Sequence, residues 1–177
     1  MKKLALLTIF AALMMISSAA FAQTTANGTL TVTATVTGSI QLVFNSDASG
    51  VALASGAGTN TATLAFGNVS AFGAVAAGVV RTTTATTFTV SSAVDVLVAK
   101  TNSASANYTL KAQLGAADAV NTWSVGGVAV TNAAQSTLTA TGTYAANSNF
   151  PVAITVPFTA ASGTAISNTI NYTATAN

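Results

Sequence analysis

The stretch Gly28 to Thr37, GTLTVTATVT, alternates apolar and hydroxyl side chains from Thr29 onward. Its even positions carry the apolar side chains of Leu30, Val32, Ala34 and Val36. A period of two is typical of a β-strand with one apolar and one polar face. The stretch therefore predicts a strand whose apolar face must be covered by a sheet.

The residues before this stretch have the three parts of a secretory signal peptide. Lys2 and Lys3 precede an apolar run from Leu4 to Ile16, and Ala20-Phe21-Ala22 offers a small-x-small cleavage site. The run is short for a membrane span, although an uncleaved anchor is the alternative. We expect residues 1–22 to be removed on export and the mature chain not to insert stably into a membrane.

The mature chain is expected to be formally neutral once Lys2 and Lys3 are lost. Its charged residues are three cations and three anions: Arg81, Lys100, Lys111, Asp47, Asp95 and Asp118. Such a chain lacks the basic footprint that binds nucleic acid, and its surface does not strongly repel copies of itself. The 155 residues that remain (177 − 22) are enough for one domain.

The rest of the chain reads as all-β. Alternating or apolar runs are separated by turn residues and predict strands at 40–44, 63–67, 82–90, 93–99, 108–114, 138–144, 150–158 and 166–174, with a hairpin around Gly126-Gly127 and a loop at 51–60. Pro157 suggests a strand edge or terminus. About eight short strands separated by turns predict a two-sheet β-sandwich, with a closed barrel as the alternative.

The chain offers little chemistry. It has no cysteine, histidine or glutamate, so no metal site, cofactor site or catalytic site is expected, and we interpret the protein as a non-enzyme. Asp47 and Asp118 lie in turn contexts where Asp binds its own backbone. Asp95 interrupts an apolar run and is expected to pair with Lys100 or Arg81.

Aromatic residues offer a second interpretation. The chain has one tryptophan and three tyrosines, namely Trp123, Tyr108, Tyr144 and Tyr172. They could stack on sugars in a secreted monomeric binding module, although their place in alternating runs favours packing within the sheets.

Three segments resemble archaic chaperone–usher pilins of the spore coat protein U group. They are GTLTVTATVTGSIQLVF from Gly28, TLAFG at 63–67, and the ending VPFTAASGTAISNTINYTATAN. Family members commonly have a cysteine where this chain has Ser39. The resemblance implies an immunoglobulin-like sandwich, residues 38–177, that lacks one strand and is completed by the N-terminal extension of the next subunit, residues 23–37.

The resemblance also implies roles for particular residues. The donor strand would insert Leu30, Val32, Ala34 and Val36, and Gly38 would be the hinge between extension and domain. The acceptor groove would be lined by Ile40, Leu42, Phe44, Ile166, Ile170 and Tyr172. A periplasmic chaperone and an outer-membrane usher would assemble such subunits into a head-to-tail homopolymer on the cell surface, for adhesion or biofilm formation. The alternative is that residues 28–37 form the first strand of their own domain, because pairing within one chain demands the same alternation.

Overall fold

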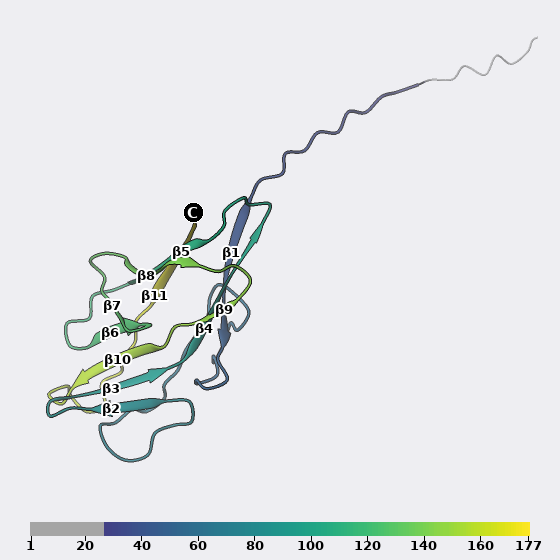
Figure 1. Ribbon diagram of the computed structural model, residues 1–177. Coiled ribbons are helices and arrows are strands. Elements are labelled where there is room, and N and C mark those ends of the chain that lie inside the picture. Colours follow the sequence, from purple (N-terminus) through teal and green to yellow (C-terminus); the bar gives the residue numbers. More distant parts are fainter. Residues whose placement is uncertain (1–26) are drawn as a thin grey trace, which may run out of the picture. The chain divides into compact units, whose positions relative to one another are not determined.

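The computed structural model describes residues 27–177 (Figure 1). The signal peptide expected at residues 1–22, and residues 23–26 of the expected extension, lie outside the described residues. The chain divides after Thr35 into two units, and the strands of the described part all belong to the second, Val36–Asn177. In chain order they are β1 (Ser39–Ser46), β2 (Val80–Thr83), β3 (Thr87–Ser92), β4 (Val94–Thr101), β5 (Tyr108–Leu114), β6 (Thr122–Val125), β7 (Val128–Val130), β8 (Ser136–Gly142), β9 (Asn147–Asn149), β10 (Val152–Pro157) and β11 (Ile170–Ala176).

These strands form three antiparallel sheets, with the orders β1-β4-β9, β2-β3-β10-β6-β7 and β11-β5-β8 (Figure 1). Residues 27–177 contain no helix, so the predicted all-β class is confirmed. The sheets pack against one another, but there are three hydrogen-bonded sheets, whereas the sequence predicted a sandwich of two sheets. An alternating pattern shows which face of a strand is apolar and does not show which strands become neighbours.

The core has two clusters that share residues at their boundary. The larger contains the inward side chains of the five-stranded sheet, among them Phe88, Val90 and Ile154. The smaller consists of Val96, Val98, Tyr108 and Leu110, all of them fully buried. Phe44, Leu138, Phe150 and Tyr172 pack against both clusters and so join the sheets.

Several predicted strands are confirmed with small changes of boundary. β5 buries every second residue, as its apolar alternation predicted. β4 was expected to be buried on most of its length, but only Val94, Val96 and Val98 are fully buried. The Gly126-Gly127 hairpin is present between β6 and β7, and both glycines have the positive φ, 57° and 79°, that a two-residue hairpin turn requires. Pro157 ends β10, as expected of a strand terminus, although β10 is a central strand of its sheet.

Two predicted strands are wrong. Residues 63–67 form only an isolated bridge, Ser55↔Thr63, and Leu64 and Phe66 pack on the core from a loop. The run 82–90 is split by a turn in which the Thr84 backbone N–H donates to the Thr87 carbonyl at 2.8 Å. Because threonine fills both strands and also the turn between them, the composition of this run gave no sign of the reversal.

Candidate functional site: the open edges of β1 and β11

Strands β1 and β11 each pair with one other strand only. β1 pairs with β4, and β11 pairs with β5. Across the gap between these two edges, the Phe44 and Tyr172 rings meet edge to face with centroids 5.0 Å apart. The pairing of the described strands includes no ladder between β1 and β11. We call these two strands the open edge pair.

The two strands of the open edge pair run in opposite directions. Ser39, which starts β1, lies opposite Thr101 of β4. Asn177, which follows β11, donates its backbone N–H to the Asn107 carbonyl at 3.0 Å. The short segment 101–107 therefore joins the start of β1 to the end of β11, and Figure 1 shows the C-terminus beside the beginning of β1.

Hydrogen bonds at the edge of β1 show which of its backbone groups face the gap. The Phe44 N–H donates to the Thr59 carbonyl at 2.9 Å, and the Gly58 N–H donates to the Phe44 carbonyl at 2.7 Å. Alternate residues of a strand direct these groups to the same side. Ile40 and Leu42 therefore direct theirs away from β4, and the turn 56–61 covers this edge only at Phe44.

The edge of β11 follows the same rule. The carbonyl of Thr169 accepts from Gly115, and the N–H of Asn177 donates toward Asn107, so odd-numbered residues face β5. Ile170, Tyr172 and Ala174 direct their N–H and C=O groups away from β5. The loop and turn hydrogen bonds of the described residues do not reach these groups.

The side chains of these same residues point toward the core but are only half-buried. Ile40, Leu42 and Ala174 pack against the smaller cluster, whereas Ile166 and Ile170 pack against the larger one. Phe44 and Tyr172 contact both. The neighbouring strands are different: Val96, Val98 and Leu110 are fully buried. The apolar row of the open edge pair is therefore less covered than the apolar rows of the strands beside it.

No protein-family model, curated protein or solved structure matches this chain.

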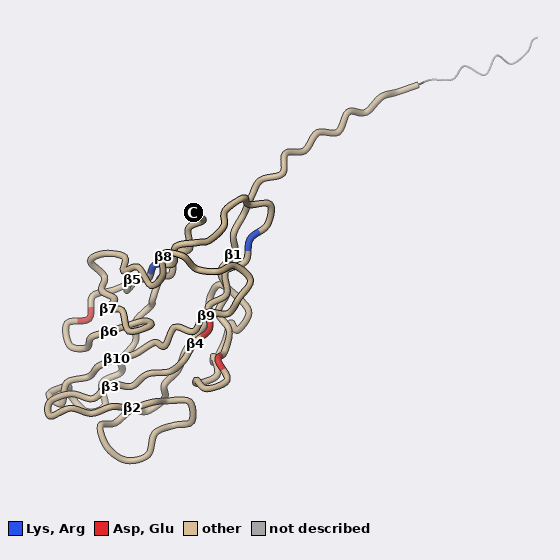
Figure 2. The backbone as a smooth tube through the Cα atoms, in the orientation of Figure 1, with Lys and Arg blue, Asp and Glu red and all other residues tan. Residues whose placement is uncertain are grey.

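The open edge pair carries no charged side chain. Burial raises the pKa of the Tyr172 hydroxyl, which stays neutral as a result. The charged residues of the described part are few and scattered (Figure 2). Recognition at these edges would therefore rest on backbone hydrogen bonds and apolar contact rather than on charge.

The structure brings all six predicted acceptor residues, Ile40, Leu42, Phe44, Ile166, Ile170 and Tyr172, onto or beside the open edge pair. Ile166 precedes β11 and is not part of a strand. Sequence reasoning did not select Ala174, although it continues the alternation of Ile170 and Tyr172. It also missed the turn 56–61, because nothing in a Gly- and Thr-rich loop indicates which edge it will cover.

The predicted donor residues lie in a segment without strand structure. Leu30, Val32 and Val36 are 88%, 81% and 74% exposed, and Ala34 is exposed as well. Residues 27–38 contain no hydrogen-bonded strand. A Cβ atom at Gly38 would lie 2.7 Å from the Asn102 carbonyl oxygen, so this position needs glycine for a close backbone approach; its role as a hinge stays a prediction.

The three aspartates have structural hydrogen bonds. Asp47 accepts from the Ser49 side chain and backbone, which lowers its pKa. Asp118 accepts from the Asn121 backbone and the Trp123 indole, so both predicted turn roles are confirmed. The expected partner of Asp95 is wrong: Asn147 and Asn149 donate to it, and no cation does.

Residues 27–177 hold no group of three or more Asp, Glu, His or Cys side chains that could bind a metal. Within the same range, no helix is long and apolar enough to cross a membrane.

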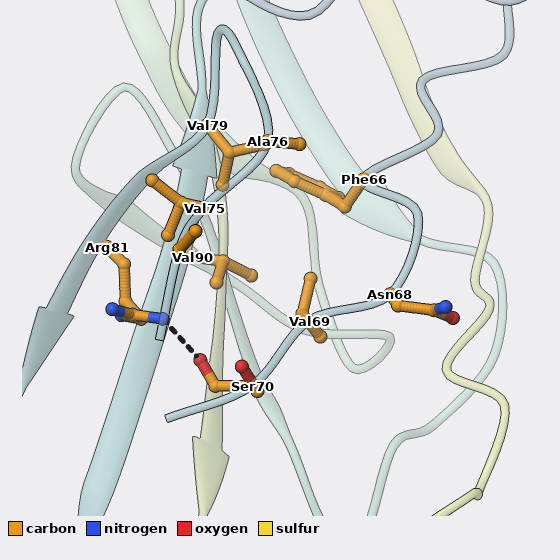
Figure 3. A pocket seen from close by; sticks show the side chains of 10 residues that line it. Phe66, Asn68, Val69, Ser70, Val75, Ala76, Val79, Arg81 and Val90 are labelled. Atoms are coloured by element: carbon orange, nitrogen blue, oxygen red, sulfur yellow. Dashed lines mark hydrogen bonds between the residues drawn. The ribbon is translucent and has the colours of Figure 1, made fainter. Parts of the chain in front are cut away.

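Packing within the sheets, rather than sugar stacking, accounts for the buried aromatic residues. Trp123 is 7% exposed and Tyr108 is fully buried. Two phenylalanines of residues 27–177 are exposed, Phe72 at 75% and Phe158 at 41%, and their rings contact each other. Arg81 fixes the loop that carries Phe72. Its guanidinium donates to the Ser70 carbonyl at 2.9 Å, as Figure 3 shows, and to the Gly73 carbonyl at 2.7 Å.

Proposed function

We propose that this protein is a subunit of an extracellular fibre in which residues 28–37 of one copy lie between β1 and β11 of the next. One observation carries the proposal: the open edge pair has free backbone groups above a half-buried apolar row, and the chain supplies an exposed alternating segment. Strand addition of this kind takes its affinity from main-chain hydrogen bonds and its specificity from alternate side chains.

The two surfaces match in length and chemistry. The ten residues 28–37 would span about 33 Å as a strand. They are long enough to lie along the whole of β1, which has eight residues, or of β11, which has seven. The segment offers Leu30, Val32, Ala34 and Val36 to the apolar row, and burying them contributes several kcal/mol at about 25 cal/mol per Å². Neither surface carries a charge that would have to be desolvated.

The direction of the incoming strand follows from the fibre geometry. If the donor strand runs parallel to β1, its C-terminal end leaves the acceptor subunit at the end of β1 opposite Ser39. The donor subunit then lies at that end, and the acceptor's own segment extends from the other end. If the donor strand runs antiparallel to β1, its C-terminal end leaves at the Ser39 end, where the acceptor's own segment also begins. The two subunits would then meet through the same end of each domain. Only the first arrangement gives an open head-to-tail chain. In this arrangement the turn 56–61 lies at the exit and limits pairing with β1 to Ile40 and Leu42.

Secretion, assembly by a periplasmic chaperone and an outer-membrane usher, and a role in adhesion or biofilm formation complete the proposal. They rest on the signal-like N-terminus and on the resemblance to chaperone–usher pilins. Open strand edges support the need for a chaperone, because uncovered edges promote aggregation before assembly.

A matched pair of charge substitutions tests the proposal. Val32→Asp places a carboxylate on the apolar side of the segment, whereas Thr33→Asp places it on the hydroxyl side. We expect size-exclusion chromatography of the chain from Gln23 to show multimers for the parent and Thr33→Asp, and only monomer for Val32→Asp. A parent chain that stays monomeric, and whose melting temperature does not change with a peptide of residues 27–37, would contradict the proposal.

Hydrogen exchange then locates the strand. Assembly should protect the amides of Leu42, Tyr172 and Ala174, which face the gap, and leave those of Val43 and Thr173 as they are in the monomer. An equal gain in protection at the gap-facing amides and at those of Val43 and Thr173 would mean that the contact lies elsewhere.

A secreted monomeric binding module is the second candidate. The exposed Phe72, on a loop that Arg81 holds and beside the exposed Phe158, favours this candidate, since aromatic residues are enriched at binding interfaces. Phe72→Ala would then abolish binding to a surface or glycan without changing the oligomeric state.

A further inference from the structure

Asn27 and Gly28 form the single Asn-Gly step of the chain. Both residues are exposed, and neither belongs to a strand. Apart from Gly28 and its two chain neighbours, no heavy atom lies within 4 Å of the position that a Cβ at Gly28 would take. The peptide bond between them is therefore open to water and free of the constraints of a sheet.

We propose that Asn27 is a site of spontaneous deamidation, with water as the co-reactant. The Gly28 backbone nitrogen, after losing its proton, attacks Cγ of Asn27. The new N–Cγ bond closes a five-membered succinimide ring, the Cγ–Nδ2 bond breaks, and ammonia leaves with the proton. Water then opens the ring at either carbonyl to give aspartate or isoaspartate. One water is consumed, one ammonia is released, and nothing is oxidised or reduced.

Glycine at the second position makes this step accessible. It has no side chain to block the attacking nitrogen, and its backbone reaches conformations that other residues avoid. The asparagines of the sheets lack this freedom. Asn45 donates to Asn147 at 3.2 Å and Asn149 donates to Asp47 at 2.8 Å, and both lie in strands with fixed backbones.

The product changes the segment in two ways. Residues 23–46 carry no charged side chain, so deamidation adds the first negative charge there. Isoaspartate also adds one carbon to the backbone, next to a strand pattern in which a shift of register moves apolar side chains to the wrong face. If residues 28–37 act as the proposed donor, a modified copy is a poorer donor, and a paired copy is protected because its backbone is held.

Peptide mapping by mass spectrometry, with enzymatic methylation to detect isoaspartate, tests the chemistry on the chain from Gln23 aged in mildly alkaline buffer. Asn27 should convert several-fold faster than Asn45 or Asn147, each of which precedes a serine. Gly28→Ala should slow the conversion at Asn27, and the open space at Gly28 makes this variant harmless to the fold. Equal rates at the three asparagines, or an unchanged rate in Gly28→Ala, would overturn the proposal.

A second comparison separates this proposal from the fibre. Monomer and multimer fractions of one preparation are aged side by side. Slower conversion in the multimer supports protection by pairing, and equal conversion contradicts that protection while the chemistry stands. If no multimer forms, the proposed fibre fails, and the rate comparison at Asn27 still decides the modification.

Discussion

Residues 28–37 and strand β5 have the same sequence pattern and opposite environments. Both alternate apolar residues with polar ones at a period of two. Leu110 in β5 has a strand on either side and is fully buried, whereas Leu30 is 88% exposed. β1 and β11 are intermediate in burial: each has one neighbouring strand, and their apolar side chains are half-buried. Across these segments burial increases with the number of neighbouring strands, although the alternation is the same in each.

Leucine-to-alanine substitutions test this comparison most strongly. Leu110→Ala should lower the free energy of unfolding of the monomer by roughly 2–5 kcal/mol, because it leaves a cavity in a closed core. Leu30→Ala should change it by less than about 0.5 kcal/mol. Chemical denaturation at a concentration where the chain is monomeric measures both. Similar losses for the two variants would mean that the N-terminal segment packs on its own domain.

Close packing inside the smaller cluster gives the next effect. A Cβ at Gly142 would overlap the ring of Tyr108, whereas one at Gly28 meets nothing. Gly142→Ala should destabilise the domain by about 1–3 kcal/mol, and Gly28→Ala should leave the melting temperature unchanged. Thermal unfolding followed by circular dichroism measures the difference. A tolerated Gly142→Ala would show that the Tyr108 ring can move aside.

The open edge should give an intermediate loss. Leu42→Ala removes a half-buried side chain and should cost the monomer about 1–2 kcal/mol, less than Leu110→Ala. The same substitution should cost an assembled multimer more, because pairing would complete the burial of Leu42. Denaturation of separated monomer and multimer measures both losses. An equal loss in the two forms would mean that assembly does not cover this edge.

The smallest effect concerns a carboxylate outside the core. Burial opposes ionisation of Asp118, but hydrogen bonds from Asn121 and Trp123 outweigh it and lower its pKa to about 2. The folded value lies below the ordinary value of about 3.9, so the carboxylate stabilises the fold above that pH and its contribution is lost as the pH falls toward 2. Solvent screening keeps the contribution at about 1 kcal/mol or less.

Asp118→Asn should remove this part of the acid dependence, and the fluorescence of Trp123, the one tryptophan, reports it. Parent and variant should differ at neutral pH and converge in acid. Identical acid titrations of the two proteins would show that the hydrogen bond from the Trp123 indole does not depend on the charge.

The sequence by itself determined the all-β class, the buried face of β5, the Gly126-Gly127 turn and the turn roles of Asp47 and Asp118. Each of these depends on residues close together in the chain, through the alternation of side chains, the positive φ of glycine or a local hydrogen bond. The six acceptor residues came from the resemblance to chaperone–usher pilins, and their apolar alternation agrees with side chains that face a core.

Only the tertiary structure decided which strands became neighbours. The sequence did not show that the pairing leaves β1 and β11 open toward each other, that the turn 56–61 covers β1 at Phe44, or that Asn147 and Asn149 rather than a cation bind Asp95. These features join residues far apart in the chain, and a strand's alternation is the same whether it has two neighbours, one or none. For this reason the sequence defines the apolar face of residues 28–37, whereas the partner of that face depends on tertiary and quaternary contacts.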